Sequence, residues 1–192
     1  VSGGYAASDG GYVFAGNVGG YPYDGGYIVK TDSNGDIEWL QPGYLGWIGS
    51  VTETDDGGSI LGSSKDSDYW LIKLNSDGSA DWDETYDPGS GTSYSIRSVD
   101  QAIDGGYIAT GYVKEFDNTY NITLLKVDSN GVFDWHEEYM ESNGKDDFGN
   151  SVVAASDGGY ILTGLGEAGP NHTIGKLYIL KTTDSGLAII CP

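Results

Sequence analysis

The chain has 192 residues and carries 29 acidic against nine basic side chains, which gives a formal net charge of -20. Such a charge repels nucleic-acid phosphates and anionic membrane surfaces, and the sequence has no basic stripe to overcome the repulsion. No stretch approaches the ~20 apolar residues of a membrane span. A single cysteine, Cys191, excludes an intrachain disulfide. We therefore expect no nucleic-acid partner and no insertion into a membrane.

Two short motifs recur along the chain. The tripeptide Asp-Gly-Gly begins at Asp9, Asp56, Asp104 and Asp157, at intervals of 47, 48 and 53 residues. A second turn, such as TDSNG or VDSNG, follows a lysine after each of the four copies, at Lys30, Lys73, Lys126 and Lys181. Self-similarity at a fixed period predicts an array of repeated structural units.

The first unit predicts four short strands. Residues 2–7 lead into the Asp-Gly-Gly turn, where glycine supplies positive φ at no steric cost. A second strand over Tyr12–Ala15, a third over Tyr27–Val29 and a fourth through Trp39 follow. The third strand is continuously apolar, which is expected where both faces of a sheet are covered.

The second and third units repeat this order. Their expected strands are Ser50–Glu53, Ser59–Leu61, Trp70–Ile72 and a strand through Trp82, then Ser98–Gln101, Tyr107–Thr110, Thr123–Leu125 and a strand through Trp135. We expect Trp39, Trp82 and Trp135 to occupy equivalent buried or half-buried places. Units of about 40 to 50 residues with one Trp each are typical of β-propeller blades.

The fourth unit is shorter than the others. Its strands are expected at Ser151–Ala154, Tyr160–Thr163, Tyr178–Leu180 and Gly186–Ile190, and Ile190 stands where the other units have Trp. The sequence thus predicts one all-β domain over residues 1–192. We expect a β-propeller of four four-stranded blades, at approximately 1–46, 47–94, 95–148 and 149–192, and leave open whether it belongs to a larger or oligomeric array.

The layout SV…DGGYI..G…YLIK.DSNG…W runs over essentially the whole chain. It resembles the Asp-Gly-Gly-Tyr repeats of archaeal and bacterial cell-surface β-propellers, and it is similar in layout to kelch blades. The resemblance implies secretion and display at the cell surface, and it supplies no catalytic residues. We therefore expect a non-enzymatic, extracellular or cell-surface protein with a structural or adhesive role.

The second turn also looks like a relative of the sialidase Asp-box, but it departs from that motif. Asn34 precedes the turn glycine directly and Trp39 follows it by four places, whereas the Asp-box has Asp two before and Trp three after. Sialidases also hold a carboxylate with several arginines, and Arg97 is the one arginine here. Sialidase activity is therefore not expected.

No catalytic residue and no resident cofactor are predicted. Asp32, Asn34 and Asp36 begin a calcium-loop pattern that lacks its distant Glu, so a hairpin turn explains them better and calcium remains an alternative. His136 and His172 show no metal or triad spacing. A glycoside hydrolase that uses two of the 29 acids is kept as a second alternative.

Several side chains in the connections are candidates for a partner surface. These aromatic residues exceed what the repeat demands: Tyr21, Tyr23, Tyr44, Trp47, Tyr94, Phe116 and Tyr120. Exposed aromatics favour a protein partner or a carbohydrate-binding module, although they could equally cover the ends of the blades. Sequons at Asn121 and Asn171 indicate glycosylation sites.

The last predicted strand is apolar and lies at an edge. Bare apolar strands tend to pair with other chains. We therefore expect self-association, with a second copy, a surface protein or a glycan as the partner.

Overall fold

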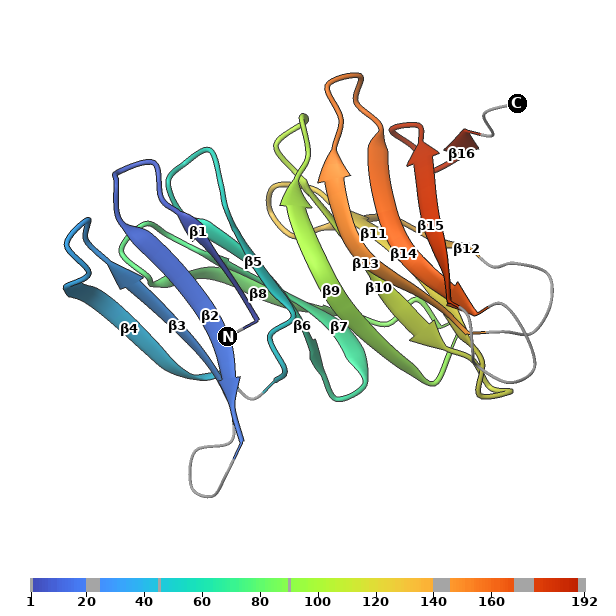
Figure 1. Cartoon of the computed structure of the whole chain (residues 1–192), viewed down its shortest axis with the longest axis horizontal. Coiled ribbons are helices and arrows are strands. Elements are labelled where there is room, and N and C mark those ends of the chain that lie inside the picture. The colour runs from blue at the N-terminus through green and yellow to red at the C-terminus, as the bar shows by residue number, and fades with distance from the viewer. Residues whose placement is uncertain are drawn as a thin grey trace.

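The computed structural model describes residues 2–19, 25–44, 46–89, 91–139, 146–167 and 175–189. They form four antiparallel sheets of four strands each, set side by side along the molecule (Figure 1). This architecture confirms the predicted all-β fold of four four-stranded blades. Within the described ranges, no helix has the length and apolar character needed to cross a membrane.

Each sheet is hydrogen-bonded in chain order. The first sheet contains β1 (Gly3–Ala6), β2 (Tyr12–Val18), β3 (Gly25–Thr31) and β4 (Ile37–Tyr44). The second contains β5 (Ser50–Glu53), β6 (Ser59–Lys65), β7 (Asp68–Leu74) and β8 (Ala80–Tyr86). The third contains β9 (Ser93–Gln101), β10 (Tyr107–Lys114), β11 (Tyr120–Val127) and β12 (Phe133–Tyr139). The fourth contains β13 (Asp147–Ala154), β14 (Tyr160–Glu167), β15 (Gly175–Thr182) and β16 (Ala188–Ile189).

Turn chemistry explains why each unit begins with Asp-Gly-Gly. The first glycine of every copy has a φ between 76° and 92°, a region that favours glycine: Gly10, Gly57, Gly105 and Gly158. The second glycine is needed for a different reason, which is a close contact with the backbone of the third strand. A Cβ on Gly58 would lie 2.2 Å from the carbonyl oxygen of Leu74. Asp56 Oδ1 accepts the N–H of Gly58 at 2.9 Å and so closes the turn.

The recurring lysine completes this turn. The ammonium of Lys73 is buried, lies 2.8 Å from Asp56 Oδ2 and donates to the carbonyl oxygen of Leu74 at 2.9 Å. The same Lys–Asp pair recurs in the other three sheets: Lys30 with Asp9, Lys126 with Asp104 and Lys181 with Asp157. The lysine therefore ties the third strand to the turn between the first two strands.

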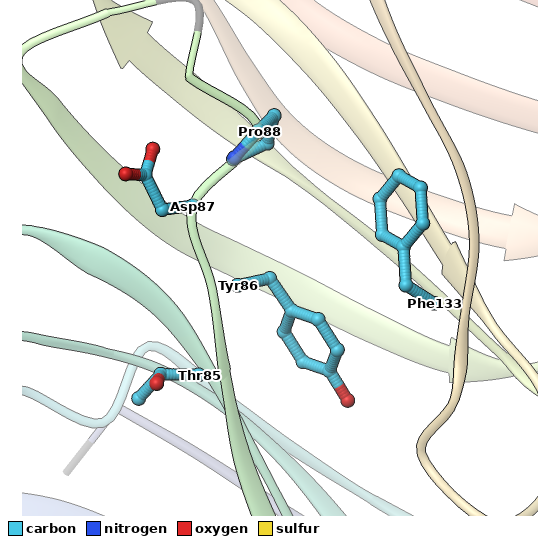
Figure 2. A pocket seen from close by; sticks show the side chains of 5 residues that line it. All are labelled: Thr85, Tyr86, Asp87, Pro88 and Phe133. Carbon is cyan, nitrogen blue, oxygen red and sulfur yellow. The ribbon is translucent and has the colours of Figure 1, made fainter.

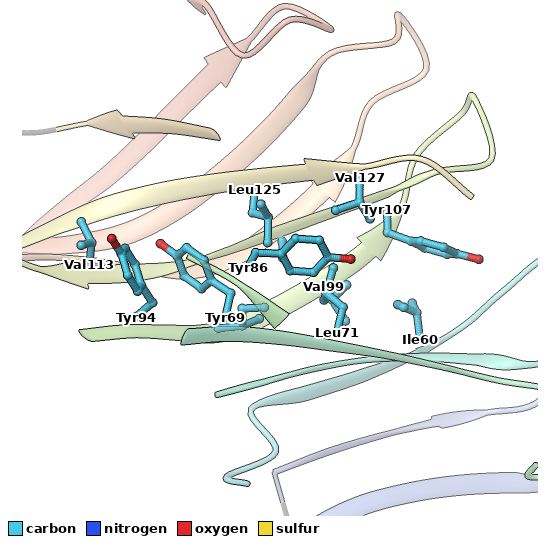
Figure 3. Packing of buried hydrophobic residues seen from close by; sticks show 12 residues of the cluster. Ile60, Tyr69, Leu71, Tyr86, Tyr94, Val99, Tyr107, Val113, Leu125 and Val127 are labelled. Atoms are coloured by element: carbon cyan, nitrogen blue, oxygen red, sulfur yellow. The ribbon is translucent and has the colours of Figure 1, made fainter. Parts of the chain in front are cut away.

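The sheets pack face to face, and a separate apolar cluster fills each of the three spaces between them. Figure 3 shows the middle cluster, in which Ile60 and Leu71 of the second sheet approach Leu125 and Val127 of the third. The first strands of neighbouring sheets are in contact, since the N–H of Val152 in β13 donates to Ser98 Oγ in β9 at 3.2 Å. Contact of this kind along one inner edge is the arrangement of propeller blades.

The array is open. The first sheet lies at one end of the molecule and the fourth at the other (Figure 1). Each of the two inner sheets is covered on both faces, whereas each outer sheet has one face turned away from the rest of the array.

Candidate interaction surfaces

Each sheet has two faces, which the repeat positions define. We call the face toward the next sheet in the chain the forward face, and the face toward the preceding sheet the back face. On the forward faces of the first three sheets, the second and third strands place fully buried aliphatic side chains: Val13 and Ile28, Ile60 and Leu71, Ile108 and Leu124. Aliphatic side chains at these positions thus form one side of every internal joint.

The back faces supply the other side of each joint. In the second strands, buried side chains occupy the same repeat position: Leu61, Ala109 and Leu162. Tyr107 and Tyr160 begin the second strands of the third and fourth sheets. Their rings lie 5.8 Å from that of Trp82 and 5.9 Å from that of Trp135, respectively, so each contacts the fourth strand of the preceding sheet.

The tryptophans confirm their predicted equivalence. Each is half-buried and lies opposite the recurring lysine on the neighbouring strand of its sheet: Trp39 opposite Lys30, Trp82 opposite Lys73 and Trp135 opposite Lys126. Each ring also covers the turn glycine of the next sheet, since an added Cβ at Gly78, Gly131 and Gly186 would lie 2.7, 3.0 and 2.8 Å from it. Gly35, the corresponding glycine of the first sheet, has no atom within 4 Å of such a Cβ.

The forward face of the fourth sheet is apolar and uncovered. Ile161 occupies the position of Ile108, and Ile179 that of Leu124, but Ile179 is 66% exposed. Neighbouring exposed side chains extend the patch, which we call the forward end face: Val153, Ile161, Leu177, Ile179 and Ile189. Terminal repeats of soluble arrays normally present a polar outer face. This sheet therefore has the surface of an internal blade.

The back face of the first sheet is uncovered in the same way. Tyr12 occupies the position of Tyr107 and Phe14 that of Ala109, yet Tyr12 and Phe14 are each 41% exposed. Val18 is also exposed, although Val113 at the same repeat position is fully buried. We call Tyr12, Phe14 and Val18 the back end face. It too has the residues of an internal joint.

The fourth sheet corrects one sequence expectation. In the first three sheets an irregularity in the ladder lets the recurring lysine pair with Trp. In the fourth sheet Thr182 pairs with Ala188 and Lys181 with Ile189, with no extra residue between them. Ile189 thus holds the ladder place of Trp, whereas Ile190 lies outside the described residues.

The aromatic residues predicted to form a partner surface differ in their solvent exposure. Trp47 and Phe116 are exposed, at 69% and 75%, whereas Tyr120 is half-buried against Phe148 at a centroid distance of 5.2 Å. Tyr94 corrects the prediction, because it is 3% exposed and belongs to the core. It lies in β9 rather than in a connection, and its ring packs 4.8 Å from that of Tyr69. Tyr21, Tyr23 and the side chain of Tyr44 lie outside the described residues.

Of the two predicted glycosylation sites, Asn121 does not offer a free amide in the folded chain. Asn121 is buried in β11, and its Nδ2 donates to Glu115 at 3.1 Å and to Glu138 at 3.4 Å. Burial, together with the hydrogen bond to Glu138, raises the pKa of Glu115. Asn121 is therefore a structural bridge between two carboxyl groups. Asn171 lies outside the described residues.

The turn at Asp32 and the side chain of His136 make structural contacts. Asp32 Oδ1 accepts the N–H groups of Asn34 at 2.8 Å and Asp36 at 2.9 Å, which is the hairpin alternative to a calcium loop. Burial lowers the pKa of His136, whose Nε2 lies 3.3 Å from the Tyr69 hydroxyl. His172 is not among the described residues, and within the described ranges no group of three His, Cys, Asp or Glu could hold a metal.

A cleft of about 480 Å³ lies beside the first strands, where Arg97 is held in place. The guanidinium of Arg97 lies over the rings of Tyr112 and Phe148, at 5.0 and 4.8 Å, and donates to Asn150 Oδ1 at 2.7 Å. Exposed Trp47 also lines this cleft. Within the part of the chain that the structure describes, Arg97 forms no ion pair. The cleft therefore combines a cation with an aromatic surface.

A second hollow of about 390 Å³ lies between β8 and β12 (Figure 2). Its lining comprises Thr85, Tyr86, Asp87, Pro88 and Phe133. The Tyr86 hydroxyl donates to the carbonyl oxygen of Gly131 at 2.7 Å and so serves the joint between two sheets. Asp87 is the one carboxylate in this lining, so the hollow offers no carboxylate pair.

Comparison with known proteins supports the fold. No family model and no curated protein matches the chain. A protein of unknown function from Bacteroides caccae is similar in structure, with a TM-score of 0.52, 17% identity and coverage of 90% of this chain and 58% of that one. An endo-arabinase from Bacteroides thetaiotaomicron VPI-5482 gives a TM-score of 0.55 and 16% identity, over 98% of this chain and 74% of that one. The chain thus spans 58% of the first structure's length, and the shared feature is the β-propeller fold.

Proposed function

We propose that this chain is a non-enzymatic propeller segment of the extracellular space or cell surface, which acts as a structural or adhesive subunit through its two end faces. The observation that carries the proposal is the exposure of Ile179 and Leu177, at 66% and 70%, where Leu124 and Ile122 are fully buried. A contiguous apolar surface of this kind marks a protein contact. The sheet at the other end offers a second such contact.

The charged groups of the chain support a structural role. The Asp-Gly-Gly carboxylates are engaged by lysines and backbone N–H groups, as in the pair of Asp157 and Lys181 at 2.8 Å. Their placement stabilises turns. The net charge of -20 favours solubility while the apolar end faces supply the attraction. The cell-surface location rests on the resemblance of the repeats.

The proposal is tested by fractionating the source cells. The wild-type chain is expected in the surface or secreted fraction, and Ile179→Asp is expected to weaken its retention there because a charge enters the forward end face. Val132→Asp is the control, since Val132 is 60% exposed in a turn away from both end faces. A wild-type chain found only inside the cell, or equal retention of both variants, would overturn the proposal.

Carbohydrate binding is the second candidate function, and the Arg97 cleft favours it. Aromatic rings stack on sugar faces, and a fixed guanidinium recognises carboxylate or hydroxyl groups. A glycan array probed with wild type, Trp47→Ala and Arg97→Gln tests it. Binding that both substitutions reduce at least about tenfold would support the cleft, whereas an array without hits would remove this candidate.

A further inference from the structure

We propose that each end face is covered by the opposite end face of a second copy of this chain, so that two copies close head to tail into a ring of eight blades. The inference rests on the proposed function, because it names the occupant of the same two surfaces. At each contact between the two copies, the forward end face of one copy would pack against the back end face of the other.

The first argument is the repeat register. At the joint between the third and fourth sheets, Ile108, Ile122 and Leu124 pack against Leu162 and other back-face residues. Ile161, Leu177 and Ile179 occupy the three corresponding positions of the fourth sheet and are exposed. The forward end face is therefore one half of a joint that the molecule already forms three times.

The complementary half is present at the other end of the same chain. Tyr12 corresponds to Tyr107 and Tyr160, which contact a preceding tryptophan in the internal joints. Gly35 has open space where the other turn glycines lie under a tryptophan ring. The back end face is thus shaped to receive the fourth strand of a preceding blade.

Compared with the internal joints, the forward end face has a smaller side chain at one position and the back end face has a larger one. Ile189 holds the ladder place of Trp and is smaller than Trp. On the back end face, Phe14 is larger than Leu61, Ala109 and Leu162 at the same repeat position. A joint between two copies would therefore lose volume on one side and gain it on the other, as close packing requires. An unrelated partner would give no reason for this compensation.

Symmetry favours a closed dimer. A joint between two different faces gives a ring if its rotation closes and a filament if it does not. Closed propellers usually have about four to eight blades. Two copies of four sheets make eight, whereas three copies would exceed that range. Closure would bury both end faces of both copies and leave no apolar edge.

The net charge of the chain makes the association of two copies depend on ionic strength. Each copy carries a formal net charge of -20, so two copies repel each other at long range. Salt screens this repulsion and does not weaken apolar contact. Association of the two copies should therefore strengthen between low and physiological ionic strength, in contrast to an interface held by ion pairs.

The test is sedimentation of the purified chain together with two end-face variants, Ile179→Asp and Phe14→Asp. Wild type is expected to have twice the monomer mass at physiological salt. Each variant alone should be monomeric, because every joint would contain one damaged half. An equimolar mixture of the two variants should form a heterodimer through its one intact joint, weaker than wild type by at least about tenfold.

Other outcomes overturn the inference. A wild-type monomer at about 100 μM, a concentration well above micromolar affinity, would leave another occupant, such as a further blade, to cover the faces. A dimer that survives Ile179→Asp would show that like end faces pair with each other. Circular dichroism confirms folding, and Ile179→Val and Phe14→Leu serve as conservative controls that retain the dimer. A monomeric chain whose surface retention still depends on Ile179 would end the second-copy inference and leave the proposed function standing.

Discussion

The inner and outer sheets of this molecule are built from the same residue pattern but meet different surroundings. Leu71 and Leu124 of the inner sheets are fully buried, whereas Ile179 at the same position of the fourth sheet is exposed. Side-chain chemistry does not change between them. What changes is the presence of a neighbouring sheet, so the repeat specifies a two-sided blade wherever it occurs. The outer sheets accordingly expose apolar side chains that are buried at the same repeat positions of the inner sheets.

Truncation of a buried side chain in an inner sheet should cost far more stability than truncation of its exposed counterpart in the fourth sheet. Leu124→Ala should lower the free energy of unfolding by about 2 to 5 kcal/mol, because it opens a cavity between two sheets. Ile179→Ala should cost less than about 1 kcal/mol in the dissociated chain, because its side chain is already in water. Urea unfolding at low protein concentration measures both. Equal losses would contradict the assignment of Ile179 to an uncovered face.

Trp82 gives the next largest effect. Trp82→Ala removes a half-buried ring that contacts Tyr107 and covers Gly131, and its Nε1–H donates to the carbonyl oxygen of Ser129 at 3.3 Å. The expected loss is about 2 to 3 kcal/mol, below the usual range for a fully buried Trp. Trp47→Ala is the matched control, since that ring is exposed, and it should leave the unfolding midpoint unchanged. A loss below about 1 kcal/mol for Trp82 would break the blade equivalence.

The sequence predicted the strands and tryptophans because a period repeated four times averages out local ambiguity. It did not predict the lysine–aspartate pairs, since the partners lie 17 to 24 residues apart and meet only through the hairpin register. Their joint recurrence in all four units was the available signal. Tyr94 was misplaced because β9 begins at Ser93, five residues before the predicted strand. The exposure of Ile179 depends on a neighbour, which its own residues do not reveal.

The lysine–aspartate pairs of the inner and outer sheets are expected to contribute less to stability than the apolar side chains. Asp56→Asn keeps the acceptor for Gly58 but leaves the buried ammonium of Lys73 without its counter-charge. We expect a loss of about 1 to 2 kcal/mol, at the low end because the carboxylate is itself largely solvated. Asp157→Asn should cost less, because the side chain of Lys181 is 25% exposed and water can replace the carboxylate. Thermal unfolding of both variants compares the inner and outer turns, and a larger loss at Asp157 would contradict the argument.

Acid should remove the same contribution in wild type. Burial opposes ionisation of Asp56, but hydrogen bonds from Lys73 and Thr54 lower its pKa from its usual 3.8 to about 2. The unfolded chain therefore binds the proton more readily, so the contribution of Asp56 is fully present above pH 3.8 and is lost as the pH falls through 2. The difference in unfolding free energy between wild type and Asp56→Asn should thus be constant from pH 7 to pH 5 and shrink between pH 4 and pH 2. Urea unfolding across this range measures it. A difference that instead widened with acid would show that the Asp56 carboxylate does not stabilise the folded turn.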